Sequence, residues 1–265
     1  MTNKIKFAML GNSLFAGLIV VTAVLYMVID CSPYIFKPIA SLLFVLCGVF
    51  NLIYVFSVLK IRRNIPFIVS MMAGLIFACL GDILLIDHFV IGAGLFAIGH
   101  IFFFVSFVCL TGFKLRDFLI GLAIFAVVLC LVLFVPFFDF GDKKILVIAY
   151  AFVISFMLGK AVGNVFLTEN RQVHLIIMLG ALLFFVSDFM LMIYLFGGKF
   201  IVFDILCLAT YYPAEFLLAF TIFYVATNFN GRSFEIDDIK NMGLVVDGDD
   251  SQEIKEKTID SQNQQ

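Results

Sequence analysis

The amino-acid sequence predicts an all-α integral membrane protein, a polytopic bundle of eight transmembrane helices. Composition is the first observation: 63% of the residues are hydrophobic and 14% are charged, whereas a soluble domain is roughly half apolar. Segment length is the second, because cutting the chain at charged residues and Gly/Pro breaks leaves eight segments of about the 20 residues needed to cross a bilayer. The connections between them are short, so consecutive helices should be antiparallel neighbours.

The first predicted span, residues 7–29, directly follows MTNKIKF. It is too long for the apolar part of a removed signal peptide and lacks a clear small-residue cleavage site, so we expect it to serve as both span and targeting signal. The remaining spans are predicted at residues 35–59, 65–86, 89–110, 117–137, 145–167, 173–196 and 201–227.

These segments divide the chain into an eight-span transmembrane domain at 1–228 and a tail at 229–265. The tail is acidic and rich in Ser, Gln and Asp, so we expect it to be disordered. Basic residues gather at the helix ends that share a side with the N-terminus, which predicts cytoplasmic termini. The membrane compartment and the oligomeric state stay open.

The formal net charge is −2, which predicts no nucleic-acid partner. The six cysteines form no CxxC pair, so neither a disulfide framework nor a metal site is expected. No cofactor is predicted.

Two aspartates stand out because they lie inside apolar spans. Asp82 belongs to GLIFACLGDILLI and Asp188 to GALLFFVSDFMLMI; each follows a Gly by eight positions and directly follows a small residue. A charged group at that depth costs at least about 2.5 kcal/mol on insertion scales and is a functional-site hypothesis by default.

The similar contexts of Asp82 and Asp188 also suggest an internal repeat. The two residues fall on the third and seventh predicted spans, which run in the same direction. The halves of the domain would then be two parallel four-helix repeats, related by an axis along the membrane normal. This arrangement predicts that the two carboxylates face each other across the bundle.

Other polar residues could converge on the same site. On the second predicted span Lys37, Ser41, Gly48 and Asn51 share one helical stripe. Lys37 could snorkel to the headgroups or meet an aspartate or a substrate phosphate, and the sequence leaves both options open.

Three further spans carry polar groups. His100 follows a Gly-rich lead-in and lies near the centre of its span, where a pairing role and a site role are both open. Lys160, Asn164 and Thr168 form a second stripe, which we interpret as interfacial snorkelling. The last span carries TYYPAEF, with Tyr211, Tyr212 and Glu215 around Pro213, so Tyr211 and Glu215 share a face. Pro213 should leave backbone carbonyls to be satisfied inside the bundle.

Two carboxylates without a metal motif suit general acid–base hydrolysis. One carboxyl donates a proton while the other, ionised, orients water or stabilises a cation. Glycosidases use this principle through an oxocarbenium-like transition state, and a vinyl ether reacts through a similar cation. Composition alone does not select that substrate.

The chain resembles the YhhN-like lysoplasmalogenase family. The resemblance rests on the order and spacing of LGDILL with Asp82, His100 on the next span, GALLFFVSD with Asp188, the pair Lys37-Pro38 and the pair Tyr211-Tyr212. It covers residues 7 to 227 and stops before the acidic tail.

That resemblance implies hydrolysis of the vinyl-ether bond of lysoplasmalogens, with a lysophospholipid as substrate and membrane lipid as surroundings. It implies Asp82 and Asp188 as the catalytic pair. Lys37, His100, Tyr211, Tyr212, Glu215 and Asn51 are the predicted substrate-binding set, with Lys37 meeting the phosphate. Glu215 departs from the family pattern, where a Gln is expected after the tyrosine pair, and this departure would alter the charge of the site or the choice of substrate.

Two other classes of function compete with this hypothesis. A proton- or cation-coupled transporter would also use intramembrane carboxylates and a Pro-interrupted last span, although no matching broken helix is seen in the first half. In a structural or lipid-sensing protein, Asp82 and Asp188 would only pair helices. Aldehyde release from lysoplasmalogen separates the enzyme from both.

Overall fold

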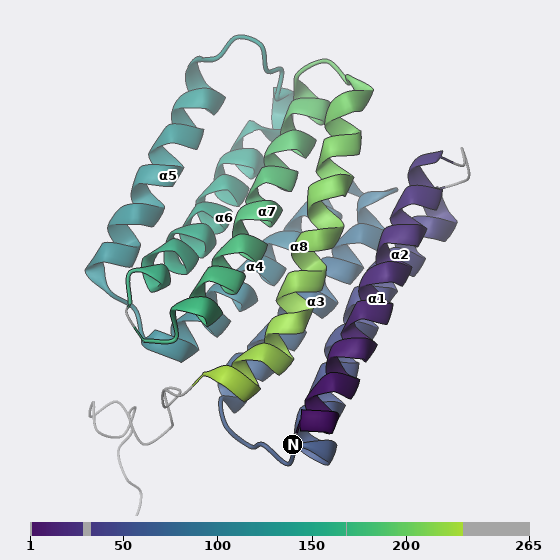
Figure 1. Ribbon diagram of the computed structural model, residues 1–265. Coiled ribbons are helices and arrows are strands. Elements are labelled where there is room, and N and C mark those ends of the chain that lie inside the picture. Colours follow the sequence, from purple (N-terminus) through teal and green to yellow (C-terminus); the bar gives the residue numbers. More distant parts are fainter. Residues whose placement is uncertain (1, 29–32, 168, 230–265) are drawn as a thin grey trace, which may run out of the picture. The chain divides into compact units, whose positions relative to one another are not determined.

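The computed structural model describes residues 2–28, 33–167 and 169–229, which fold as one compact helical unit (Figure 1). In this part of the chain the long helices are α1 (Thr2–Val28), α2 (Pro33–Ile53), α3 (Ile65–Leu85), α4 (Phe89–Thr111), α5 (Leu115–Phe134), α6 (Lys144–Val165), α7 (Arg171–Phe196) and α8 (Ile201–Asn228). A π-helical turn, Tyr54–Val58, extends α2, and a 3-10 turn, Gly141–Lys143, precedes α6. Apart from Phe229, the predicted tail lies outside the described residues.

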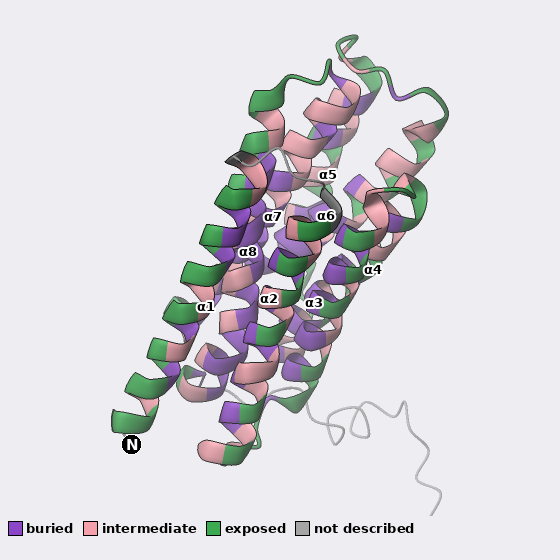
Figure 2. Cartoon of the chain, turned by 90° about the vertical axis from the view of Figure 1, so that its right-hand side faces the viewer, coloured by how far each residue is buried: buried purple, intermediate pink, exposed green. Residues whose placement is uncertain are grey.

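All eight of these described helices are long and apolar enough to cross a membrane. Large hydrophobic side chains such as Leu10, Leu115 and Ile145 are exposed, and exposed positions alternate with buried ones along the helices (Figure 2). In water such a surface would be an aggregation hazard, but in a bilayer it is the expected lipid-facing surface. The predicted all-α, multi-pass class is confirmed.

Most helix boundaries agree with the predicted spans to within a few residues, but α1 begins at Thr2, five residues before the predicted start at residue 7. The end of α5 differs for a local reason. The fifth span was predicted to end at residue 137, but α5 ends at Phe134. Val135 is extended, with φ −86° and ψ 111°, because the ring of Pro136 disfavours a helical residue before it.

Helix packing repeats with a period of four helices. The pairs α1–α2, α2–α3 and α3–α4 correspond to α5–α6, α6–α7 and α7–α8, and the contact of α2 with α8 corresponds to that of α6 with α4. Asn64 and Asn170 precede α3 and α7 in the same left-handed conformation, with φ of 57° and 55°. Their separation in the sequence equals that of Asp82 and Asp188. This is the pattern of two parallel four-helix repeats.

The repeat is broken on one side of α4. α8 packs against both α1 and α3, whereas the corresponding pairs, α4 with α5 and α4 with α7, lack comparable backbone contact. Aromatic side chains bridge the wider gap, as in the edge-to-face pair of Phe96 and Phe184. The second half of the bundle is therefore more open than the first.

Close packing between α3 and α4 depends on glycine. A Cβ on Gly92 would lie 2.5 Å from the Cα of Leu85, which is a backbone atom and cannot give way. Small residues at such positions let helix backbones approach in a membrane. This close contact fixes α4 relative to the helix that carries Asp82.

The last helix, α8, runs through Pro213 without a break. Neighbouring groups and local adjustments accommodate proline inside membrane helices. The expectation of an interrupted last span, on which the transporter hypothesis partly relied, is therefore wrong.

Candidate functional site

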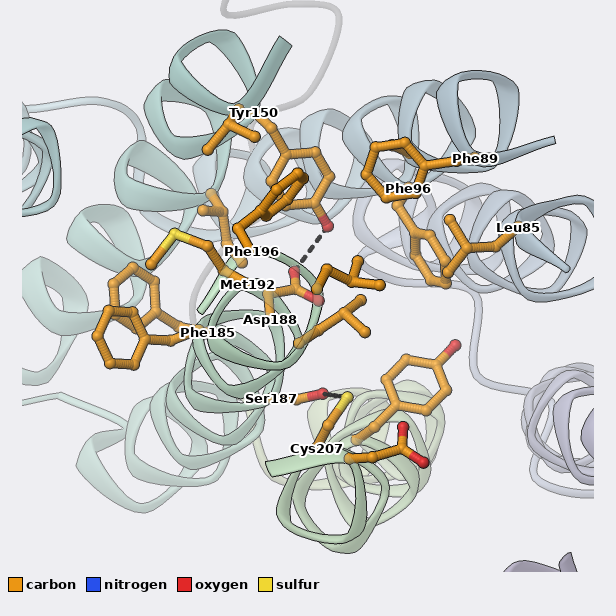
Figure 3. Close-up of a pocket in the computed structure, with 18 of the residues that line it drawn as sticks. Leu85, Phe89, Phe96, Tyr150, Phe185, Ser187, Asp188, Met192, Phe196 and Cys207 are labelled. Atoms are coloured by element: carbon orange, nitrogen blue, oxygen red, sulfur yellow. Dashed lines mark hydrogen bonds between the residues drawn. The ribbon is translucent and has the colours of Figure 1, made fainter. Parts of the chain in front are cut away.

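One cavity reaches both intramembrane aspartates. It has a volume of about 150 Å³ and is lined mainly by apolar side chains, among which Asp82 and Asp188 are polar exceptions. In Figure 3, Phe89 and Phe96 lie across the cavity from Phe185 and Met192, with Asp188 between them.

The cavity occupies one end of the bundle. Its lining includes residues from the last turns of α7, such as Phe196, and from the first turns of α4 and α6, such as Phe89 and Leu146. This is the end opposite to the N-terminus (Figure 1). By the predicted orientation, it is the non-cytoplasmic end.

Asp82 is held by groups from two other helices. Ser41 on α2 and Tyr211 on α8 each donate a hydrogen bond of 2.6 Å to its Oδ2. The Nζ of Lys37 lies 3.4 Å from Oδ1. The Asp82 side chain is only 3% exposed, so a cation and two donors compensate a carboxylate removed from water.

Asp188 has different partners. The Tyr150 hydroxyl donates a 2.6 Å hydrogen bond to Oδ2, and the Nε2 of His100 lies 3.1 Å from the same oxygen and 2.8 Å from the Tyr150 hydroxyl. Within the described part of the chain, neither Lys nor Arg forms an ion pair with Asp188. Its side chain is 14% exposed, and no described hydrogen bond reaches Oδ1, so that oxygen remains available to a molecule in the cavity.

The two carboxylate clusters follow the repeat of the fold. Asp82 on α3 is bound from α2 and α8, and Asp188 on α7 is bound from the corresponding helices α6 and α4. Equivalent helices therefore carry different chemistry. Lys37 and Ser41 on α2 have Tyr150 on α6 as their counterpart, and Tyr211 on α8 has His100 on α4, although the positions along the helices differ. A two-fold scaffold thus holds one cationic half-site and one without a Lys or Arg.

The other predicted binding residues lie at different distances from the cavity. Lys37 and Tyr211 line it, whereas His100 is fully buried behind Asp188. Tyr212 and Glu215 are buried in α8 and do not belong to the lining. No hydrogen bond of good geometry reaches the Glu215 carboxyl among the described residues, although Tyr211 is close by.

Asn51 lies elsewhere in the bundle. Its amide exchanges two 2.8 Å hydrogen bonds with that of Asn12 on α1, and its nitrogen also donates to the carbonyl of Ala219 on α8. The structure therefore places Asn51 in a helix-joining contact outside the cavity lining.

Tyr26, Tyr150 and Asp204 also line the cavity, although none of them was predicted as a site residue. Ser41 was noted only as part of a helical stripe. Tyr150 carries no local signal, because its partners come from α4 and α7. Asp204 falls in the first turn of α8, where it resembles an ordinary helix-end carboxylate.

The interpretation of Lys160 as an interfacial residue is wrong. Lys160 is 1% exposed, and its Nζ lies 2.7 Å from Asp117 on α5 and 2.9 Å from the hydroxyl of Thr111. The carboxylate of Asp117, on the preceding helix α5, compensates the buried ammonium of Lys160. The periodicity of polar residues within α6 could not show this contact. Asn164 joins this cluster through Thr111, while Thr168 lies outside the described residues.

Within the described residues, no group of three or more His, Cys, Asp or Glu side chains is placed to hold a metal ion. What the cavity offers is proton exchange at two carboxylates and electrostatic binding at Lys37, within apolar walls. Fold and site together define a multi-pass membrane protein with a paired-carboxylate cavity.

Within that class, the model of the YhhN family matches residues 32–222. This match spans most of the membrane region, and the chain belongs to the YhhN family. No curated protein and no solved structure matched the chain.

Proposed function

We propose that the protein is a lysoplasmalogenase, which hydrolyses the vinyl-ether bond of a 1-alkenyl lysophospholipid to a fatty aldehyde and glycerophosphoethanolamine or glycerophosphocholine. The observation that carries the proposal is that Asp82 and Asp188 line one apolar cavity but have different electrostatic partners. Acid–base hydrolysis needs such a difference, with one carboxyl donating a proton and the other accepting one. Membership of the YhhN family supports the same conclusion.

The cavity suits the reacting end of a membrane lipid. Its volume of about 150 Å³ is too small for a whole lysophospholipid, but its apolar walls are compatible with an alkenyl chain that continues between the helices into the bilayer. The open side next to α4, where α5 and α7 lack close backbone contact with it, is the route that we assign to the chain.

We assign the first proton transfer to Asp188. Its proton adds to the β-carbon of the vinyl ether, so the carbon–carbon double bond is lost and an oxocarbenium ion forms. Among the described residues no Lys or Arg pairs with Asp188, and its Oδ1, which accepts no hydrogen bond there, can carry the proton toward the cavity. Tyr150 and His100 are positioning residues, which would stabilise the carboxylate left after the transfer.

Asp82 takes the second step. Lys37, Ser41 and Tyr211 stabilise negative charge on Asp82 against the burial that opposes it, and we assign to Asp82 the acceptance of a proton from the water that adds to the oxocarbenium carbon. As the hemiacetal breaks its bond to the glycerol oxygen, Asp82 returns its proton to that oxygen, and the hydroxyl proton of the hemiacetal passes to Asp188 as the aldehyde carbonyl forms. One water is consumed, and both carboxyls end in their starting states. Lys37, which lines the cavity, would also meet the substrate phosphate.

The test is release of fatty aldehyde from 1-alkenyl glycerophosphoethanolamine by the purified protein in detergent. We expect Asp82→Asn and Asp188→Asn each to lower kcat by about a hundredfold or more, the usual contribution of a general acid or base. The 1-alkyl analogue, which lacks the double bond, should not be cleaved.

Asp142→Asn is the matched control. Asp142 is 86% exposed, pairs with the adjacent Lys143 and does not line the cavity, so this variant should keep full activity. Full activity in folded Asp82→Asn or Asp188→Asn protein would overturn the mechanism. Absence of aldehyde from the wild-type protein would overturn the function.

A further inference from the structure

The cavity has a polar mouth, formed by three residues of which only Lys37 has a role in the proposed reaction. Tyr26 lies near the end of α1, Lys37 near the start of α2 and Asp204 in the first turn of α8. These helix ends belong to the same end of the bundle (Figure 1). We call these three residues the headgroup pocket.

Asp204 is the unexplained member of the headgroup pocket. Its side chain is partly buried and lines the cavity, yet no hydrogen bond or ion pair among the described residues involves it. It is close enough to Lys37 to interact electrostatically, but the two are not in ion-pair contact. In the first turn of α8, the negative charge of Asp204 interacts favourably with the helix dipole. That interaction is modest, and it does not explain why the carboxylate faces the cavity.

The charges are arranged in an order along the cavity. Lys37 lies next to Asp82, at the reacting end. Asp204 precedes Tyr211, which binds Asp82, by two turns on the same helix, which corresponds to roughly 10 Å toward the mouth. A ligand that runs from the reacting carboxylates to the mouth would therefore meet a positive group first and a negative group afterwards.

We propose that Asp204 binds the ammonium of a zwitterionic headgroup whose phosphate is bound by Lys37, and so makes the protein selective for ethanolamine lysophospholipids. This inference rests on the proposed function. In such a lipid the vinyl ether, the phosphate and the ammonium follow one another in the order that the cavity requires.

Selectivity follows from hydrogen bonding. A primary ammonium donates charge-assisted hydrogen bonds to a carboxylate, which are stronger than neutral ones. The trimethylammonium of choline has no such donor and keeps its charge further from the carboxylate oxygens. Ethanolamine should therefore gain more from Asp204 than choline does, and a headgroup that ends in the phosphate should gain nothing.

The test compares Asp204→Asn with wild-type protein on three substrates: 1-alkenyl glycerophosphoethanolamine, 1-alkenyl glycerophosphocholine and 1-alkenyl glycerophosphate. We expect KM for the ethanolamine lipid to rise about tenfold with little change in kcat, the size of effect that loss of one charge-assisted hydrogen bond gives. KM for the choline lipid should rise less, and KM for the glycerophosphate should not rise. Unchanged turnover of the glycerophosphate also shows that the variant is folded.

Asp142→Asn is again the matched control, because it removes an exposed carboxylate at the same end of the bundle. It should leave the ratio of the three KM values as in the wild type. Equal KM increases for all three substrates in Asp204→Asn, or no change in any of them, would overturn the inference.

A binding measurement separates this inference from the proposed function. The uncleavable 1-alkyl glycerophosphoethanolamine and 1-alkyl glycerophosphate should bind wild-type protein, and Asp204→Asn should weaken only the first. That result would support the headgroup pocket even if the wild-type protein released no aldehyde. If Asp204→Asn bound each lipid with the same affinity as the wild-type protein, the headgroup pocket would be overturned, whether or not the protein releases aldehyde.

Discussion

Tyr150 connects the Asp188 half-site to the rest of the bundle. Its hydroxyl donates to Asp188 and contacts His100, and its ring forms part of the cavity wall. Changing Tyr150 to Phe keeps the ring and removes the hydroxyl. Because one buried hydrogen bond to the reacting carboxyl is lost, at a cost of about 1 to 2 kcal/mol, kcat should fall about tenfold. Steady-state kinetics of aldehyde release measure this.

The control for Tyr150→Phe is Tyr224→Phe. The ring of Tyr224 packs against that of Phe220 in a tilted arrangement and does not line the cavity, so this change should leave kcat and KM unaltered. A substrate-binding role for the Tyr150 hydroxyl would instead raise KM at constant kcat, and equal activity of Tyr150→Phe and wild type would remove the hydroxyl from the mechanism.

Some site residues can be identified from the sequence and others cannot. Asp82, Asp188 and Lys37 can be identified because a charge inside an apolar span is conspicuous by itself. Tyr150 and Asp204 cannot, because a tyrosine in a span and an acid at a helix start are common without any site. Asn51 shares a helical stripe with Lys37, yet it pairs with α1. The periodicity of polar residues shows which face of a helix they share. It does not show which of them, along the length of that face, reach the cavity.

At the scale of helices, the packing of α4 on α3 can be tested with two glycines. A Cβ at Gly92 would clash with the backbone of Leu85, while one at Gly94 would meet nothing within 4 Å. We expect Gly92→Ala to destabilise the protein by about 1 to 3 kcal/mol, the usual cost of overpacking. Gly94→Ala should be neutral or stabilising, because alanine is the better helix former.

Thermal unfolding in one detergent measures both glycine variants. Because α4 carries His100, which contacts Asp188, Gly92→Ala should also reduce aldehyde release, and Gly94→Ala should not. Equal unfolding temperatures for the two variants would contradict the close α3–α4 contact.

Helix positions could be predicted from the sequence because span length and hydropathy are local properties. Pairings between helices could not, apart from most neighbours joined by short connections. Even that expectation is wrong for α4 and α5, which are joined by residues 112–114 but lack close backbone contact. The contacts of α2 with α8 and of α4 with α6 depend on how each helix is rotated, and a nearly uniform apolar surface does not encode this. The Lys160–Asp117 pair was missed for the same reason.

At the scale of the whole molecule, the four-helix repeat accounts for two carboxylates that line the same cavity. Equivalent helices α3 and α7 run in the same direction, and Asp82 and Asp188 stand at the same position from the start of each helix. The halves have diverged in what surrounds each carboxylate, with Lys37 beside one and His100 with Tyr150 beside the other. The unequal packing around α4 supplies the cavity.

The same arrangement makes the orientation of the molecule a functional question. Residues of the cavity mouth lie at the helix ends opposite to the N-terminus, and the positive-inside rule predicts that the N-terminus is cytoplasmic. A fluorescent protein that folds only in the cytoplasm should therefore be bright when fused after residue 228. Alkaline phosphatase, which is active only outside it, should be active when fused within residues 197–200. The opposite pattern would place the cavity mouth on the cytoplasmic side, and the substrate would then enter from the cytoplasmic leaflet.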